Sequence, residues 1–204
     1  MSVQTFAAPP AWLSTPAKGA LTQEETARLD AIFARILPSD PARHIPGAVK
    51  VGASAYVSQL LAMPFEVYFE IEGWFLFYPL GLSALERFCA AQHQQKLTEI
   101  DDAKMNALIA GLEQGQVAGL SIAEEMSKID PKLVERMKEL VAKNRLTTLT
   151  LKNDRLEINQ PMLFKTLWRH CIQGCLADPR WGGNKDKLMW RAIGYLQPAE
   201  DNLA

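Results

Sequence analysis

Hydrophobic residues recur with a helical period near the start of the chain. The clearest example is residues 21–40, where apolar positions are spaced by three and four residues, as one helix face requires. Thr22 and Glu25 precede this face with the spacing of a capping box, and Pro38 ends it because proline cannot continue the backbone ladder. The residues predicted to point inward from this helix are Leu29, Ile32, Phe33, Ile36 and Leu37.

The same period predicts helices in most of the remaining chain. Ser83 and Glu86 form a second capping box behind Pro79, Thr98 is expected to start another helix, and Asn159 is the expected N-cap of a later one. These further helices are predicted over residues 49–63, 83–94, 98–115, 131–144 and 159–175. Their inward residues are Val49, Ala53, Tyr56, Val57, Leu60 and Leu61; Leu85, Phe88 and Cys89; Met105, Leu108, Ile109 and Leu112; Leu133, Val134, Met137, Leu140 and Val141; and Leu163, Phe164, Leu167, Cys171 and Cys175.

Two short stretches have a different pattern. Residues 65–72 alternate in a strand-like way but also fit a helical face, and helix is favoured because the neighbouring segments are helical. Residues 149–158 alternate on both sides of Asn153-Asp154, two turn-forming residues, which is typical of a β-hairpin.

Together these patterns predict a mainly α, single-domain helical bundle with one small β-hairpin at about 149–158. The domain is expected to span residues 21–204. Residues 1–20 have no basic region, twin arginine or continuous apolar core, and their prolines predict an extended arm rather than an export signal. The apolar, uncharged run over residues 73–85 is shorter than the roughly 20 residues of a membrane-spanning helix, so no membrane span is expected.

Charge and composition exclude one class of partner. The chain has 22 Lys and Arg against 23 Asp and Glu, a net charge of -1. Binding a polyphosphate backbone requires clustered cations, so no nucleic acid partner is expected.

No motif in the sequence indicates catalysis or metal binding. Gly182-Gly183-Asn184 lacks the glycine spacing and following lysine of phosphate-binding loops, and a tight turn explains these glycines better. Cys171 and Cys175 share a helix face, but a zinc site ordinarily needs four ligands. Together with Cys89, these thiols are expected to be reduced core residues, and no cofactor is expected in this chain.

Aromatic residues are unusually dense in residues 65–78, which hold seven of the 17 in the chain. Core packing is one explanation. A domain of this size can hardly bury all seven, however, and an excess of aromatic residues is a feature of protein interfaces. We therefore predict that Trp74, Phe75, Phe77 and Tyr78 belong to a partner interface.

The stretch "DPRWGGNKDKLMWRAIGY" predicts a rigid structural motif near the C-terminus. Asp178-Pro179 would end the preceding helix and Gly182-Gly183 would form a turn. Either Asn184 or Asp186 would cap a short helix that Gly194 closes. The aromatic residues that this motif would orient, as packing anchors or as part of a partner surface, are Trp181, Trp190 and Tyr195.

This stretch resembles the C-terminal signature of the gluconate 2-dehydrogenase subunit 3 family. The N-terminal stretch "LTQEETARLDAIFARILPSDPARHIPGAVKVGASAYVSQLL" is similar to the same family's N-terminal pattern. The resemblance covers roughly residues 20–62 and 161–196, in the family's order. Trp181, where tyrosine is commoner, and Met189, where the family has glycine, are departures from the pattern.

The resemblance implies an accessory role rather than a reaction. Members of this family are the non-catalytic small subunits of bacterial, membrane-associated dehydrogenases. Their partner is a large FAD-containing subunit of the glucose-methanol-choline type, which oxidises a sugar, sugar acid, glycoside or polyol. A cytochrome c subunit often takes the electrons onward. The resemblance implies a location in the periplasm or on the periplasmic face of the inner membrane, and a cytoplasmic location stays open because no export signal is recognised in residues 1–20. The small subunit supports maturation, stability or export of the flavoprotein. Two alternatives stay open: a stand-alone small enzyme that uses His170 or Cys171, and a transient export chaperone.

Overall fold

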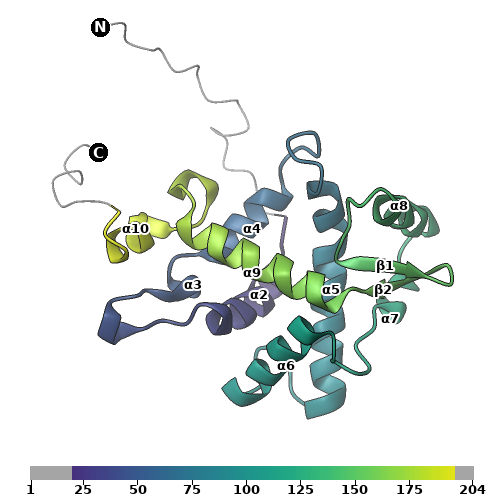
Figure 1. Ribbon diagram of the computed structural model, residues 1–204, viewed down its shortest axis with the longest axis horizontal. Coiled ribbons are helices and arrows are strands. Elements are labelled where there is room, and N and C mark those ends of the chain that lie inside the picture. The colour runs from purple at the N-terminus through teal and green to yellow at the C-terminus, as the bar shows by residue number, and fades with distance from the viewer. Residues whose placement is uncertain (1–19, 196–204) are drawn as a thin grey trace, which may run out of the picture.

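The computed structural model describes residues 20–195, and within them the chain is mainly α-helical with one antiparallel hairpin (Figure 1). The predicted fold class is therefore confirmed. The predicted N-terminal arm lies outside the described residues, apart from Ala20. The α-helices are α2 (Gln23–Ile36), α3 (Gly47–Lys50), α4 (Ala53–Leu61), α5 (Ile71–His93), α6 (Asp102–Gln114), α7 (Ala123–Met126), α8 (Pro131–Ala142), α9 (Gln160–Leu176) and α10 (Leu188–Ala192). The strands are β1 (Leu149–Lys152) and β2 (Arg155–Ile158), and the 3-10 helices are η1 (Pro41–Arg43), η2 (Pro179–Trp181) and η3 (Lys185–Lys187).

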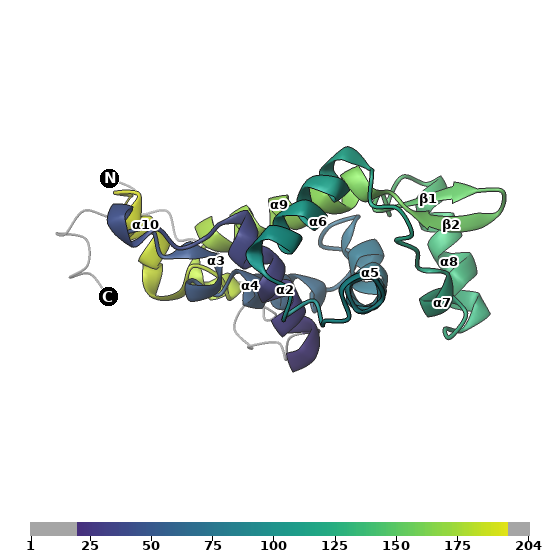
Figure 2. The same ribbon diagram turned by 90° about the horizontal axis from the view of Figure 1, so that it is seen from below.

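Helix α9 crosses the middle of an elongated molecule. Figures 1 and 2 show α3 and α10 toward one end and the hairpin with α7 and α8 toward the other. Helices α2, α3, α4 and α6 all contact α9, so it joins the parts of the core. Asn159 caps this helix, as predicted, by accepting a hydrogen bond from the backbone N–H of Met162. Its buried face carries Leu163, Leu167, Cys171 and Cys175, which confirms their inward position.

The start of α2 follows from local sequence alone. The Thr22 Oγ1 accepts the Glu25 N–H at 3.2 Å, and the Glu25 carboxylate accepts the Thr22 N–H at 2.8 Å. This reciprocal pair is the predicted capping box. Behind it, Leu29, Ile32 and Phe33 are buried.

The single helix predicted over residues 49–63 is wrong, because the left-handed Gly52 divides this segment and α3 begins before it, at Gly47. Gly47 has φ 72° and lies against the backbone of Ser39, where a Cβ would come within 2.6 Å of the Ser39 nitrogen. Gly52 has φ 73° and separates α3 from α4. Val49 consequently falls on an exposed part of α3 rather than pointing inward. Periodicity cannot register such breaks, since they come from backbone conformation.

Helix α5 corrects two more predictions. Residues 65–70 form turns rather than a helix, and α5 then runs from Ile71 to His93 through Pro79, so Ser83 and Glu86 lie inside the helix rather than at a capping box that starts it. A proline inside a helix costs about 3 kcal/mol. Burial of Trp74, Phe77 and other apolar residues of α5 contributes about 1.5–3 kcal/mol each, which exceeds that cost. Among the described residues, no helix is both long enough and apolar enough to span a bilayer.

Two later helices differ from prediction in detail. Helix α6 starts at Asp102 rather than at Thr98, because the Asp101 carboxylate caps it through the Lys104 N–H at 2.9 Å. Helix α8 has Met137 and Leu140 buried, but Leu133 is exposed, which corrects its predicted inward position. The apolar pattern of α8 is therefore wider than its buried face.

The hairpin forms as predicted. Leu149 pairs with Ile158 and Lys152 pairs with Arg155 in an antiparallel register. Asn153 and Asp154 have φ values of 48° and 60°, the left-handed conformation that a two-residue type I′ turn requires.

Candidate partner-binding surface

The structure divides the four aromatic residues predicted for an interface. Trp74, Phe77 and Tyr78 are only 4%, 2% and 2% exposed, whereas Phe75 is 42% exposed. The domain leaves four of the seven aromatic residues of 65–78 exposed, so it does not bury them all, but α5 turns Trp74, Phe77 and Tyr78 toward the core. Of the four predicted interface residues, only Phe75 has an exposed side chain that a partner could contact in this conformation.

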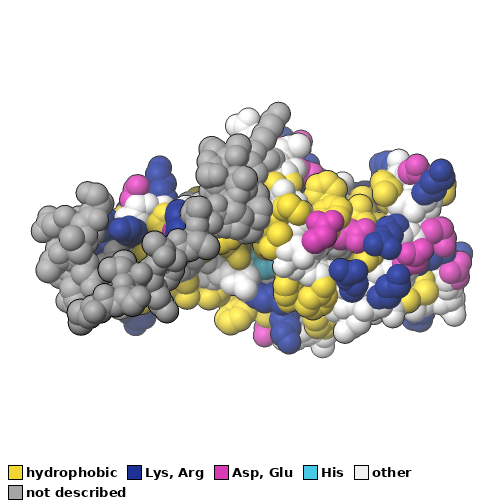
Figure 3. Space-filling model, turned by 90° about the horizontal axis from the view of Figure 1, so that it is seen from above, with side chains coloured by type: hydrophobic (Ala, Val, Ile, Leu, Met, Phe, Trp, Pro, Cys, Tyr) yellow, Lys and Arg dark blue, Asp and Glu magenta, His cyan; other side chains and the backbone are white. Residues whose placement is uncertain are grey.

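The other exposed aromatic residues of segment 65–78 lie just before α5. Phe65, Val67, Tyr68 and Phe69 are all exposed, in the turns that connect α4 to α5. The Phe65 ring lies 5.6 Å from the Phe75 ring, so the helix and the turns share one patch. We call residues 64–69 together with Phe75 the aromatic surface. Figure 3 looks onto the side of the molecule where these turns lie and shows hydrophobic side chains gathered in the middle of that face.

A buried polar cluster holds the aromatic surface in place. The Glu70 carboxylate is buried, accepts the Tyr68 hydroxyl at 2.9 Å and lies 3.4 Å from the Arg169 guanidinium. That guanidinium stacks over the Trp74 ring at 5.0 Å. Arg145 adds a hydrogen bond from its Nε to the Phe69 carbonyl at 3.0 Å. These contacts connect the turns that carry the exposed rings to α9, because Arg169 belongs to that helix.

Tyr78 and His170 join α5 to α9 inside the core. The Tyr78 hydroxyl and His170 Nδ1 lie 2.6 Å apart, and the His170 ring packs edge-on against Trp74 with centroids 4.4 Å apart. Burial lowers the pKa of His170 to about 3 and raises the pKa of Tyr78 far above its usual value. Both side chains are therefore neutral near pH 7 and act as a structural link.

The three cysteines are reduced and buried, as predicted. The pKa of the Cys171 thiol is raised mainly by a hydrogen bond with Cys175 and also by burial. Burial likewise raises the pKa of Cys89 to about 11. A reactive cysteine needs an accessible thiolate, so these positions are poor sites for nucleophilic chemistry.

A second exposed strip on α9 was missed by the sequence analysis. Trp168 and Leu176 are exposed, and with Ile172 they are spaced by four residues beside the buried face. The four-residue spacing could have predicted this strip, since it places all three side chains on one side of a helix. Leu176 and Ile172 also line a shallow groove of about 470 Å³ between α4 and α9. The other residues that line this groove are Tyr56, Met63, Gln173, Ala177, Asp178 and Trp181.

The C-terminal motif, residues 178–195, packs directly against α9, and this close approach requires glycine. After α9, the Asp178 carboxylate caps η2 by accepting the Arg180 N–H at 3.0 Å. Pro179 is the first residue of η2. Gly182 has φ 89°, the left-handed turn expected there. Gly183 is needed for a different reason, since its Cβ would lie 2.1 Å from the Gly174 carbonyl oxygen. The backbones of this motif and α9 are thus in direct contact.

Lys187 occupies the N-cap position of the short helix α10, and Asn184 rather than Asp186 accepts an N–H of its first turn. The Asn184 side chain is buried and accepts the Met189 N–H at 2.9 Å, whereas Asp186 is exposed. Gly194 has φ 73° and closes α10, and the Tyr195 N–H reaches the Trp190 carbonyl at 2.8 Å. These bonds agree with the predicted glycine closure, whereas the N-cap of α10 is Lys187 rather than Asn184 or Asp186.

The tryptophan of α10 fastens the motif to the preceding helix. The Trp190 indole donates to the Leu176 carbonyl at 2.8 Å, and its ring lies 5.2 Å from the Tyr195 ring. Tyr195 is exposed, while Trp181 and Trp190 are half-buried. Lys185 donates its backbone N–H to the Val51 carbonyl, so that N–H is not directed at a ligand. The motif has the geometry of a bracket rather than of a phosphate cradle.

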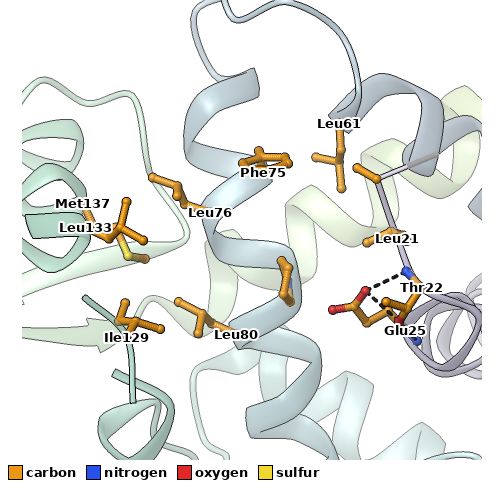
Figure 4. Close-up of a pocket in the computed structure, with 12 residues that line it drawn as sticks. Leu21, Thr22, Glu25, Leu61, Phe75, Leu76, Leu80, Ile129, Leu133 and Met137 are labelled. Carbon is orange, nitrogen blue, oxygen red and sulfur yellow. Dashed lines mark hydrogen bonds between the residues drawn. The ribbon is translucent and has the colours of Figure 1, made fainter. Parts of the chain in front are cut away.

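A groove of about 350 Å³ runs along the side of α5 beside the aromatic surface (Figure 4). Its floor is made by α5, one wall by the start of α2 and the other by α8 and Ile129. Figure 4 shows the Thr22–Glu25 capping box at one wall and Leu133 with Met137 at the other. The residues that line the groove are Ala20, Leu21, Thr22, Glu25, Leu61, Phe75, Leu76, Pro79, Leu80, Ile129, Leu133 and Met137.

These features define a class of protein. They describe a mainly helical domain with buried, neutral polar groups at its centre and a fixed aromatic surface of the kind that protein interfaces use. A sequence model of one family, gluconate 2-dehydrogenase subunit 3, matches residues 23–198, and the chain belongs to this family. Neither the curated proteins nor the solved structures gave a match. The family is that of a subunit of a dehydrogenase complex, which implies partner subunits.

Proposed function

We propose that this chain is the non-catalytic small subunit of a bacterial FAD-dependent dehydrogenase complex. Its partner is a large flavoprotein of the glucose-methanol-choline type that oxidises a sugar, sugar acid, glycoside or polyol, and FAD belongs to that partner. A cytochrome c subunit and a periplasmic location belong to the same proposal. Its role is to support maturation, stability or export of the flavoprotein.

The family match over residues 23–198 carries this proposal. The described structure supports it in two ways. His170 and Cys171, the residues that a stand-alone enzyme would use, are both buried, and burial opposes the charged form of each. The aromatic surface gives the chain a fixed apolar face, which suits a permanent subunit better than a catalyst.

Size-exclusion chromatography of the co-expressed subunits tests the proposal. We expect this chain and the large flavoprotein from the same genome to elute as one stable 1:1 complex. The purified chain alone should be colourless and should oxidise no sugar or polyol. Release of the mature flavoprotein without this chain would favour a transient export chaperone, and oxidation by the chain alone would favour an enzyme.

A further inference from the structure

The groove between α4 and α9 is lined mainly by aromatic and other apolar side chains. These apolar residues are Tyr56, Met63, Ile172, Leu176, Ala177 and Trp181. The one charged residue of its lining, Asp178, is already paired with Arg180 at 3.0 Å. Gln173 adds an exposed amide side chain, which can bond to the N–H or C=O of a peptide group. The groove therefore suits an uncharged, apolar stretch of polypeptide.

The start of the described chain is fixed on α4, close to this groove. The Ala20 N–H donates to the Ser58 carbonyl at 3.0 Å, and the Leu21 N–H donates to the Ser58 hydroxyl at 3.1 Å. Ser58 lies between Tyr56 and Met63 on the same segment, and both of these line the groove. Because a helix rises by about 1.5 Å per residue and is about 10–12 Å wide, the near side of the groove lies within roughly 15 Å of Ala20.

The sequence before Ala20 contains a segment with the chemistry that this groove requires. The segment "APPAWL", residues 8–13, is apolar, and residues 2–17 hold no charged side chain. Adjacent prolines favour the polyproline II conformation, which leaves its peptide groups free and is bound by aromatic-lined grooves. Ten residues in that conformation span about 31 Å. Pro10, ten residues before Ala20, can therefore reach the groove.

We propose that residues 8–13 of this chain lie in the groove between α4 and α9, so that the N-terminal arm straps these two helices together. The covalent link to Ala20 favours this segment over a separate chain, because a short tether holds it at an effective concentration of about millimolar. The arm covers Ile172 and Leu176, the part of the strip on α9 that lines the groove. This assignment concerns the chain by itself and does not depend on the proposed function.

Disulfide trapping in the full chain tests the assignment. Cysteine is introduced at Ser14, next to the segment, and at Leu176 in the groove, and the three native cysteines are buried. Leu151, on the hairpin, is the matched control for Leu176, because both are 44% exposed. With oxidised glutathione, Ser14→Cys with Leu176→Cys should form the intramolecular disulfide at least about ten-fold faster than Ser14→Cys with Leu151→Cys. Equal rates would overturn the assignment.

A second comparison separates binding in the groove from the effect of the tether alone. Replacing Pro9 and Pro10 by glycine keeps the length of the arm but removes its preference for polyproline II. In the chain with Ser14→Cys and Leu176→Cys, this change should slow trapping at least about five-fold, because the segment is no longer preorganised. An unchanged rate would mean that the tether alone brings the two thiols together, and the assignment would fail.

Other occupants of the groove give different results. Disulfide-linked dimers in place of the intramolecular product would assign the groove to the arm of a second copy. A thiol introduced by Leu176→Cys that iodoacetamide modifies freely in the full chain, but not in its complex with the large subunit, would assign the groove to that subunit. Either result contradicts the assignment. Failure to form the complex, with trapping as expected, would contradict only the proposed function.

Discussion

Individual residues carry the most specific part of the C-terminal signature. Gly182 is required by its left-handed φ of 89°, but Gly183 is required because α9 passes so close to it. The sequence predicted a glycine turn here without distinguishing the two reasons. Gly182 is also confined by α4, because a Cβ there would come within 2.8 Å of the Gln59 side chain and 3.0 Å of the Ala55 carbonyl oxygen.

We predict that Gly183→Ala destabilises the chain by about 3 kcal/mol, at the upper end of the cost of overpacking. The added Cβ would meet the Gly174 carbonyl at 2.1 Å, and a helix backbone cannot move aside as a flexible side chain can. Urea denaturation followed by circular dichroism measures this change. Lys185→Ala, two residues away and exposed, is the control and should change the free energy of unfolding by less than about 0.5 kcal/mol.

His170 gives the fold a pH dependence whose sign follows from its lowered pKa. Its pKa is about 3 in the folded chain and near 6.5 when unfolded, so the unfolded state binds the proton more readily between these values. The stability contributed by neutral His170 is complete above about pH 6.5 and is lost as the pH falls toward 3.

We predict that this loss amounts to about 2 kcal/mol at pH 5, from 1.36 kcal/mol per pH unit below 6.5. His170→Phe keeps a ring against Trp74 and should remove this part of the pH dependence. His44→Asn, at an exposed left-handed position, should leave the dependence intact. Parallel pH profiles for the unsubstituted chain and His170→Phe would show that His170 titrates normally.

Among the secondary-structure elements, α2 depends most on local chemistry. Thr22→Ala removes one half of the capping box and should lower the free energy of unfolding by about 1 kcal/mol. Thr22→Ser keeps the hydroxyl and should restore most of that stability. Thermal denaturation of the three chains measures the effect, and equal loss in Thr22→Ala and Thr22→Ser would show that the methyl group, not the cap, matters.

The sequence predicted the elements that local interactions determine. The capping box of α2, the Asn153-Asp154 turn and the Gly194 closure of the C-terminal motif all use residues within a few positions of one another. It failed where tertiary packing decides. The continuation of α5 through Pro79 depends on burial against distant segments, and the division at Gly52 depends on a backbone angle that periodicity cannot register.

The candidate surface shows the same limit. The density of aromatic residues in 65–78 led to the predicted interface, but it could not indicate which rings are buried. That choice is made by α9, because His170 meets Tyr78 and Trp74 from more than 90 residues away in sequence. Trp168 and Leu176 were not predicted to be exposed, because the apolar residues next to them on α9 belong to the core and the sequence pattern does not separate the two sets.

Across the whole molecule, the buried polar groups and the exposed apolar residues have different roles. The polar groups at the centre, Glu70, Arg169, Tyr78 and His170, are used to fix helices and turns to one another. The exposed apolar residues are concentrated in the aromatic surface, the strip on α9 and the groove over α5. A chain built this way is suited to holding another protein in a defined shape.

The most direct test of this account is the flavin content of the large subunit made with and without this chain. Both preparations are purified through a tag on the large subunit, and the absorbance near 450 nm is compared with the protein concentration. The account predicts a flavin spectrum and dehydrogenase activity when the two chains are co-expressed, and a strong loss of both when this chain is omitted. A large subunit that binds FAD and oxidises its substrate equally well without this chain would contradict the account.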